Sequence, residues 1–203
     1  MSQDQKRELI IETAIRRFAH YGVSKTTMSE IAKDLSFSKA LLYYYFPDKM
    51  HLVGAILEHI SEQNMIEYNS ISAETNDPRE AIQLFLEKRT DFIIKYWNII
   101  EFVLEFKNEK YPPELITIFE NLKRKELGQI TSLIESGKKQ GVFKIENSKK
   151  VAEMYLDFLI GYRKYYGSIH SNIIPDKKMF LAVLKKEKEF SVIFLNGLTC
   201  SAD

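Results

Sequence analysis

The chain has 203 residues, of which 45% are hydrophobic and 28% are charged, and its formal net charge is +1. This composition is ordinary for a folded globular protein. Residues 1–64 hold eight Lys or Arg and eight Asp or Glu, which excludes a strongly basic N-terminal domain as the basis of any contact with nucleic acid. The single cysteine, Cys200, excludes an internal disulfide framework or a CxxC site and fits a reducing cytoplasm. The opening residues lack the apolar stretch of a signal peptide, and no run approaches the roughly 20 apolar residues of a membrane span. We therefore expect a soluble, cytoplasmic protein.

The first predicted element is an amphipathic helix over residues 6–21, which Gly22 ends. Its apolar positions recur at helical spacing, with Lys, Arg and Glu on the opposite face. The apolar face consists of Leu9, Ile10, Ala14, Ile15 and Phe18. We expect this face to cover the inner side of the next segment, because short helices cannot bury themselves.

Residues 27–46 predict two short helices joined by a tight turn. Thr27 and Glu30 have the spacing of a capping box, in which the two side chains close the exposed N–H groups of a helix start. One apolar stripe follows at helical spacing, made of Ile31, Ala32 and Leu35. A Ser-Phe-Ser sequence then breaks the pattern, and Ser38 is a good N-cap for the second helix.

The second helix is predicted over residues 39–46 and has two different faces. Leu42 and Phe46 lie four residues apart, so we expect them to pack inward together. The outer side is left to Lys39, Ala40 and Tyr43. A short second helix with small, hydroxyl-bearing and basic residues outside is typical of a DNA-reading helix-turn-helix.

The remaining sequence predicts longer helices, with Pro and Gly near their ends. A fourth helix begins at Pro47-Asp48 and ends near Asn64, before a polar break over residues 70–78. The later helical ranges are 79–108, interrupted near 96–98, then 114–140, 147–170 and 175–196. No segment alternates like a strand, so the predicted fold class is all-α, with about nine helices.

Residues 26–49 resemble the N-terminal signature of the TetR/AcrR (tetracycline-repressor) family of transcriptional regulators. That signature has a Thr-rich helix start, an Ile-Ala pair, a Ser that ends the turn, an aromatic run and a Lys. Here the elements are Thr26-Thr27, Ile31-Ala32, Ser38, Leu42-Tyr43-Tyr44-Tyr45-Phe46 and Lys49. Ser36 departs from the pattern because the family usually has Gly in the turn, so we expect a non-Gly residue at positive φ.

The resemblance implies a helix-turn-helix DNA-binding domain at residues 1–48, with a signature that extends to about residue 64. Residues 49–203 would then form a helical bundle for ligand sensing and dimerisation. The implied function is transcriptional repression, with double-stranded DNA as the partner at a palindromic operator. We expect no cofactor, no metal site and no catalytic residue.

The expected DNA contacts lie on the two helices of the pair and at the start of the fourth helix. The first residues of a recognition helix read base edges, so Lys39 can donate to guanine or to a phosphate, and Ala40 can meet a thymine methyl. Tyr43 can touch a thymine methyl or reach a phosphate oxygen. By resemblance, Thr27, Tyr45 and Lys49 contact the DNA backbone. The full expected set is Thr27, Ser38, Lys39, Ala40, Leu41, Tyr43, Tyr45 and Lys49. Tyr44 is instead interpreted as filling the seam to the fourth helix.

A helix this short reads only about three or four base pairs, so selectivity demands two copies at a fixed spacing. The resemblance places the homodimer contact on the last two helices. The candidates for this interface are Phe158, Leu159, Tyr162, Phe190, Ile193 and Phe194. Burial within the protomer explains the same residues as well, and the sequence does not separate the two alternatives.

The resemblance also places an effector pocket in the second domain. The aromatic candidates for its lining are Phe92, Tyr96, Trp97, Phe102, Phe106, Phe119 and Tyr155. Ordinary core packing is the more common origin of such a stripe. If a cavity exists, it is apolar with few polar anchors, for which Arg89, Asn98 and Arg163 are candidates, so a small hydrophobic or aromatic effector is expected.

Two other functions stay open at this point. One is a DNA-binding protein of the same fold that has no small-molecule ligand. The other is a helical-bundle enzyme, although the sequence has no Gly-rich phosphate loop, no GxSxG and no HExxH. His59 and Glu62 lie one helical turn apart, but two ligands do not make a metal site.

Overall fold

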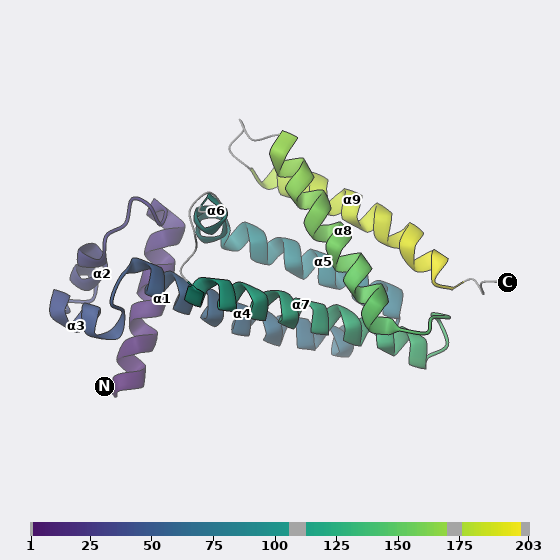
Figure 1. Ribbon diagram of the computed structural model, residues 1–203, viewed down its shortest axis with the longest axis horizontal. Helices are drawn as coiled ribbons and strands as arrows, with labels where there is room; N and C mark the ends of the chain where they lie inside the picture. Colours follow the sequence, from purple (N-terminus) through teal and green to yellow (C-terminus); the bar gives the residue numbers. More distant parts are fainter. Residues whose placement is uncertain (1, 106–112, 170–175, 200–203) are drawn as a thin grey trace. The chain divides into compact units, whose positions relative to one another are not determined.

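A computed structural model describes residues 2–105, 113–169 and 176–199, which form nine α-helices and no strand (Figure 1). The helices are α1 (Gln3–Tyr21), α2 (Met28–Asp34), α3 (Lys39–Tyr45), α4 (Lys49–Glu74), α5 (Pro78–Lys95), α6 (Trp97–Glu105), α7 (Pro113–Lys139), α8 (Ser148–Ile169) and α9 (Lys177–Gly197). The all-α prediction is confirmed for these residues. The predicted interruption near residues 96–98 is also confirmed, because α5 and α6 are separated at Tyr96.

The fourth helix is longer than the sequence analysis predicted. It continues past Asn64 to Glu74, and its extension buries Tyr68 and Ile71, which are 5% and 0% exposed. The polar stretch over residues 70–78 suggested a break, and α4 covers the first part of that stretch. Tertiary packing of the apolar face therefore outweighs the weak helix preference of the intervening Ser and Asn residues.

The chain packs into two compact units, and each of them is discontinuous in sequence. Unit 1 comprises Met1–Asn64 and Lys95–Leu122, and unit 2 comprises Met65–Ile94 and Lys123–Asp203. The domains expected from the sequence, 1–48 and 49–203, are continuous stretches, so they describe a different division. Both α4 and α7 supply residues to each unit.

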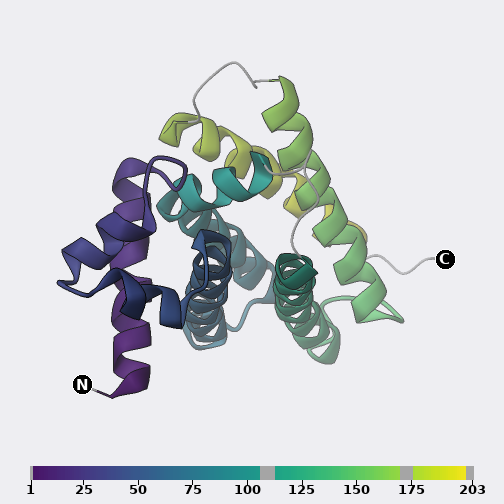
Figure 2. The ribbon, with the colours of Figure 1, turned by 60° about the vertical axis from the view of Figure 1, so that its left-hand side comes forward.

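Unit 1 is built around the first three helices, which lie side by side in both views (Figures 1 and 2). Their contact surfaces are buried apolar residues at the spacing that the sequence predicts. This core includes Ile10, Ala14 and Phe18 of α1, Ile31 of α2, Leu42 of α3, and Leu52, Val53 and Ile56 of α4, all of them 0% exposed. The inward prediction for Leu42 and Phe46 is confirmed, since Phe46 is only 3% exposed.

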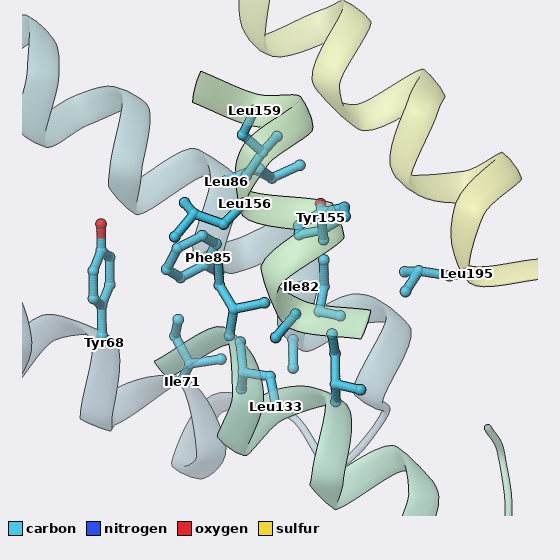
Figure 3. Close-up of a cluster of buried hydrophobic side chains, with 14 of the residues drawn as sticks. Tyr68, Ile71, Ile82, Phe85, Leu86, Leu133, Tyr155, Leu156, Leu159 and Leu195 are labelled. Carbon is cyan, nitrogen blue, oxygen red and sulfur yellow. The ribbon is translucent and has the colours of Figure 1, made fainter. Parts of the chain in front are cut away.

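Unit 2 has its own apolar core, to which α4, α5, α7, α8 and α9 contribute (Figure 3). Its labelled members are Tyr68, Ile71, Ile82, Phe85, Leu86, Leu133, Tyr155, Leu156, Leu159 and Leu195. The Tyr155 hydroxyl shares a hydrogen bond with Ser191 of α9. Burial of that hydroxyl raises the pKa of Tyr155 above its ordinary value.

A group of charged side chains is buried in unit 2. Glu187 is 0% exposed and accepts two hydrogen bonds of 2.6 Å from Arg163, which also donates to Thr90 at 2.8 Å. Arg89 donates through Nε to Glu126, and its Nη1 lies 3.7 Å from Glu187 Oε1. Burial alone would lower the pKa of Arg89, but the carboxylates of Glu126 and Glu187 raise it above its ordinary value. Pairing of opposite charges offsets part of the cost of burying them beside the apolar core of unit 2.

Two glycines of α7 give a test of the packing in unit 2. A Cβ on Gly137 would lie 2.3 Å from the buried ring of Phe143, whereas a Cβ on Gly128 would meet no atom within 4 Å. We expect Gly137→Ala to lower the free energy of unfolding by about 1–3 kcal/mol because the ring must move. Gly128→Ala should raise it by up to about 1 kcal/mol, because Ala favours the helix. Urea unfolding followed by circular dichroism measures both, and equal stability of the two variants would contradict this packing.

Candidate nucleic-acid interface

The start of α2 has the predicted capping box. The Thr27 hydroxyl accepts from Glu30 N at 3.3 Å, and Glu30 Oε2 accepts from Thr27 N at 2.8 Å. The Thr27 hydroxyl also donates to the same carboxylate oxygen at 2.8 Å. The Thr27–Glu30 prediction is therefore confirmed, and it places the Thr27 side chain at the exposed end of α2.

The turn between α2 and α3 has the strained residue that the sequence predicts. Ser36 has φ 55°, which is the left-handed region that favours glycine. Phe37 N–H donates to Ala32 O at 2.9 Å and holds the turn closed. Ser38 then caps α3 by accepting from Leu41 N–H at 3.1 Å, which confirms its predicted role as an N-cap.

The outer face of α3 carries the residues that the sequence assigned to DNA. Lys39 and Ala40 are exposed, and Tyr43 is 47% exposed. Leu41 and Tyr45 are half-buried, and their assignment to DNA stays a prediction. Because Leu42 and Phe46 anchor the opposite side, the helix presents a fixed surface of about two turns.

Tyr44 is a surface residue that the sequence analysis misplaced. It is 70% exposed, its ring meets Tyr45 edge-to-face at 5.3 Å, and its hydroxyl accepts from Gln3 Nε2 at 3.2 Å. The seam interpretation is therefore corrected. The helical period could have predicted this exposure, because Tyr44 lies two residues from both Leu42 and Phe46 and therefore faces away from them.

Arg17 ties α2 to α1 from the side. Its guanidinium contacts Asp34 at 2.5 Å and Glu30 at 3.1 Å, and it lies over the Tyr21 ring at 5.1 Å. The hydrogen bond with Asp34 raises the pKa of Arg17 above its ordinary value. The backbone N–H of Thr27, followed by its hydroxyl and by Arg17, lowers the pKa of Glu30. The sequence analysis did not identify this contact, because Arg17 lies on α1 and both of its carboxylate partners lie on α2.

Lys49 begins α4 and is half-buried. Its Nζ donates to three backbone carbonyls in the turn before α2, those of Val23 at 3.0 Å, Thr26 at 3.1 Å and Ser24 at 3.5 Å. The contact of Lys49 with the DNA backbone stays a prediction. In this structure its ammonium group faces the protein's own main chain.

The expected pocket residues lie in both units. Tyr96, Trp97, Phe102 and Phe119 belong to unit 1, and Phe92 and Tyr155 belong to unit 2. Phe106 lies outside the described residues. Among the polar candidates, Arg89 and Arg163 meet at the buried charges of unit 2, whereas Asn98 donates to Ala19 O at 2.7 Å in unit 1.

The expected dimer residues on α8 and α9 differ in exposure. Ile193 is 74% exposed, and Leu159 is 0% exposed and lies in the core of unit 2. The aromatic candidates are half-buried, and Phe158 stacks on Phe190 with ring centroids 3.4 Å apart and on Tyr162 at 5.9 Å. Other apolar residues of these two helices are at least 37% exposed: Met154, Ile160, Tyr165, Ile169, Leu181 and Val192.

The described part of the chain holds no group of three or more His, Cys, Asp or Glu residues that could bind a metal ion. His59 is bonded to Glu8 at 3.1 Å and to Gln63 at 2.8 Å. Among the helices that the structure describes, none has the length and apolar content needed to cross a bilayer.

The lowered pKa of Glu30 predicts how acid affects the cap of α2. A carboxylate with a lowered folded-state pKa stabilises the fold above its ordinary pKa, and that contribution is lost as the pH falls through the folded-state value. We expect Glu30→Gln to lower the melting temperature at pH 7 and to have a smaller effect at about pH 3, where the carboxylate has begun to take up its proton. Glu12→Gln is the control, because Glu12 only pairs with exposed Arg16 at 3.8 Å. A Glu30→Gln effect that is equal at both pH values would contradict the role of the charge.

Comparison with known proteins agrees with this geometry. Residues 10–56 match the profile of the family described as bacterial regulatory proteins, tetR family. The fold is similar to the crystal structure of a transcriptional regulator from Cytophaga hutchinsonii, with 30% sequence identity, a TM-score of 0.86 and coverage of 96% of this chain and 99% of that one.

Among curated proteins, the HTH-type transcriptional regulator YuxN of Bacillus subtilis is 28% identical over 165 residues, which are 78% of this chain and 57% of that protein. The probable acrEF/envCD operon repressor of Escherichia coli is 31% identical over 90 residues, which are 44% of this chain and 41% of that protein. The chain spans about half the length of the curated relatives it matches. The profile match and the full-length structural match together show that the chain belongs to the TetR family of bacterial transcriptional regulators.

Proposed function

We propose that the chain is a transcriptional repressor that binds a palindromic operator as a homodimer and is released by a small hydrophobic or aromatic effector. The observation that carries the DNA-binding part is the anchored α3. Its inner residues Leu42 and Phe46 are buried, and Lys39, Ala40 and Tyr43 are displayed outside. Membership of the TetR family supports a non-catalytic role in the cytoplasm, where bacterial DNA lies.

Each displayed residue type suits a different part of DNA. Lys39 can donate to guanine O6 or N7 or to a phosphate, and Ala40 fits a thymine methyl. The hydroxyl groups of Tyr43 and Tyr45 suit phosphate oxygens, which accept from any donor and set register. The Thr27 hydroxyl could donate to a phosphate only by releasing the Glu30 carboxylate, to which it donates at 2.8 Å. We add Tyr44 to this set because 70% of its surface is exposed beside Tyr43.

The dimer rests on two considerations. A seven-residue recognition helix contacts only a few base pairs, so one copy cannot select a site in a genome. The exposed apolar residues of α8 and α9, led by Ile193 at 74% exposure, are the kind of surface that a second copy covers.

Effector release follows from linkage between two binding events. A ligand lowers operator affinity only by as much as it prefers the state that binds DNA poorly. The aromatic content of α5, α6 and α8 supports an apolar ligand. The naming of one relative as an operon repressor supports repression as the outcome.

Fluorescence anisotropy with DNA from upstream of the protein's own gene tests the DNA-binding part. We expect palindrome-dependent binding by the wild type, and a loss of about 5-fold to 150-fold for Tyr43→Ala and for Lys39→Ala, because one good contact contributes about 1–3 kcal/mol. Ile66→Ala is the control, since Ile66 is 71% exposed on α4 and outside the helix pair. The absence of specific binding to every upstream fragment would reject the regulator function and favour a partner-binding or enzymatic role.

The same assay tests the effector. Adding a panel of lipophilic and aromatic compounds to the preformed complex should release DNA for at least one chemical class, and sugars and nucleotides should have no effect. Sedimentation of the protein with the active compound shows whether the dimer persists. A full panel without any change in operator binding would favour the alternative of a DNA-binding protein of this fold without a ligand.

A further inference from the structure

By its resemblance to the family signature, Lys49 is expected to contact the DNA backbone, yet its ammonium group faces the protein. An ammonium has three N–H donors, and Nζ has three carbonyl acceptors, those of Val23, Thr26 and Ser24 at 3.0, 3.1 and 3.5 Å. To donate to a phosphate, the ammonium group would have to give up one of these contacts, of which the one at 3.5 Å is the weakest. Its half-buried position also limits its reach.

The three carbonyls belong to the turn that sets the start of α2. Gly22 ends α1 with φ 80°, and Thr27 is the N-cap of α2, so the turn has only four residues between them. Val23 and Thr26 are each 1% exposed. Buried carbonyls need donors, and Lys49 brings a charged donor from a different helix. Its bonds therefore fix where Thr27 and the rest of α2 begin.

Helix α6 completes the surroundings of this ammonium group. The Phe102 ring centroid lies 5.9 Å from Lys49 Nζ, which is within the range of a cation–π contact. Two hydrogen bonds hold this region in unit 1: Asn98 Nδ2 donates to Ala19 O of α1 at 2.7 Å, and the Tyr96 hydroxyl donates to Gln63 of α4 at 3.5 Å. All of these residues lie in unit 1.

We propose that Lys49 is a positioning residue for DNA recognition, which holds the turn before α2 in place under Phe102 and does not contact phosphate. Operator affinity then depends on α6 through Phe102, although α6 carries none of the expected DNA contacts. This inference rests on the proposed function as a DNA-binding regulator. It replaces an electrostatic role for Lys49 by a conformational one.

The salt dependence of binding distinguishes the two roles. A lysine that contacts a phosphate contributes about 0.9 to the slope of log K against log salt concentration. Lys49→Met keeps the length of the side chain and removes its charge and its donors. We expect at least tenfold weaker operator binding with an unchanged slope. Lys39→Met removes the same charge from the exposed face of α3, so it shows how the slope responds to the loss of an interfacial cation.

Amide hydrogen exchange in the free protein tests the turn directly. Thr26 N–H donates to Val23 O at 3.3 Å, and Thr27 N–H donates to Glu30 Oε2 at 2.8 Å. We expect both amides to exchange faster in Lys49→Met than in the wild type, while amides of α8 are unchanged. A merely global loss of stability would accelerate both sets.

Phe102→Leu is the second variant, and it keeps Lys49 itself. It should show faster exchange at Thr26 and Thr27 and weaker operator binding with an unchanged salt slope, and it decides the question if Lys49→Met fails to fold. A slope that is shallower by about 0.9 in Lys49→Met would assign Lys49 to a phosphate and overturn the proposal. Wild-type exchange rates at both amides in Phe102→Leu would overturn it too. If the wild type binds no operator, the proposed function fails, and the exchange rates still decide the role of Lys49 in the turn.

Discussion

The surface that we propose faces DNA depends on a simple constraint: α2 and α3 have seven residues each, and helices of that length are unstable alone in water. Burial of Ile31, Leu42 and Phe46 against their neighbours supplies what their few internal hydrogen bonds cannot. Capping by Thr27 and Ser38 then satisfies one exposed N–H group at the start of each helix, that of Glu30 and that of Leu41. These inner contacts set where the outer residues of α2 and α3 lie. The proposed recognition of DNA and the stability of unit 1 therefore depend on the same buried residues.

Unit 2 combines an apolar core with charges that are paired inside it. Arg89, Glu126, Arg163 and Glu187 come from four different helices and neutralise one another. Removing one member of such a network is destabilising, because its partners are then left as buried charges without compensation. Both arginines that the sequence suggested as effector anchors are engaged in it. An effector that binds either of them must therefore compete with a carboxylate of the protein.

Sequence reasoning succeeded where structure is set by neighbours along the chain. The Thr27–Glu30 box, the Ser38 cap, the positive φ of Ser36 and the interruption at Tyr96 all depend on local spacing or on a family motif. It did not reach features made by distant residues. The extension of α4, the partners of Lys49 and the discontinuous units depend on contacts across many residues, and a helical pattern says which face is buried without saying by what. The DNA, pocket and dimer assignments have the same limit, because each depends on which partner covers a given face.

The discontinuity of unit 1 has a consequence for how such a protein can be divided. A fragment that stops at Asn64 would contain every expected DNA contact but would lack α6, and with it the Asn98–Ala19 bond and the Phe102 ring over Lys49. Transplanting the N-terminal segment onto a foreign sensor domain would therefore exchange these contacts for whatever the new host offers. Chimeric regulators made from this chain should carry residues 95–122 together with residues 1–64, because the portable module is a packing unit and not a stretch of sequence.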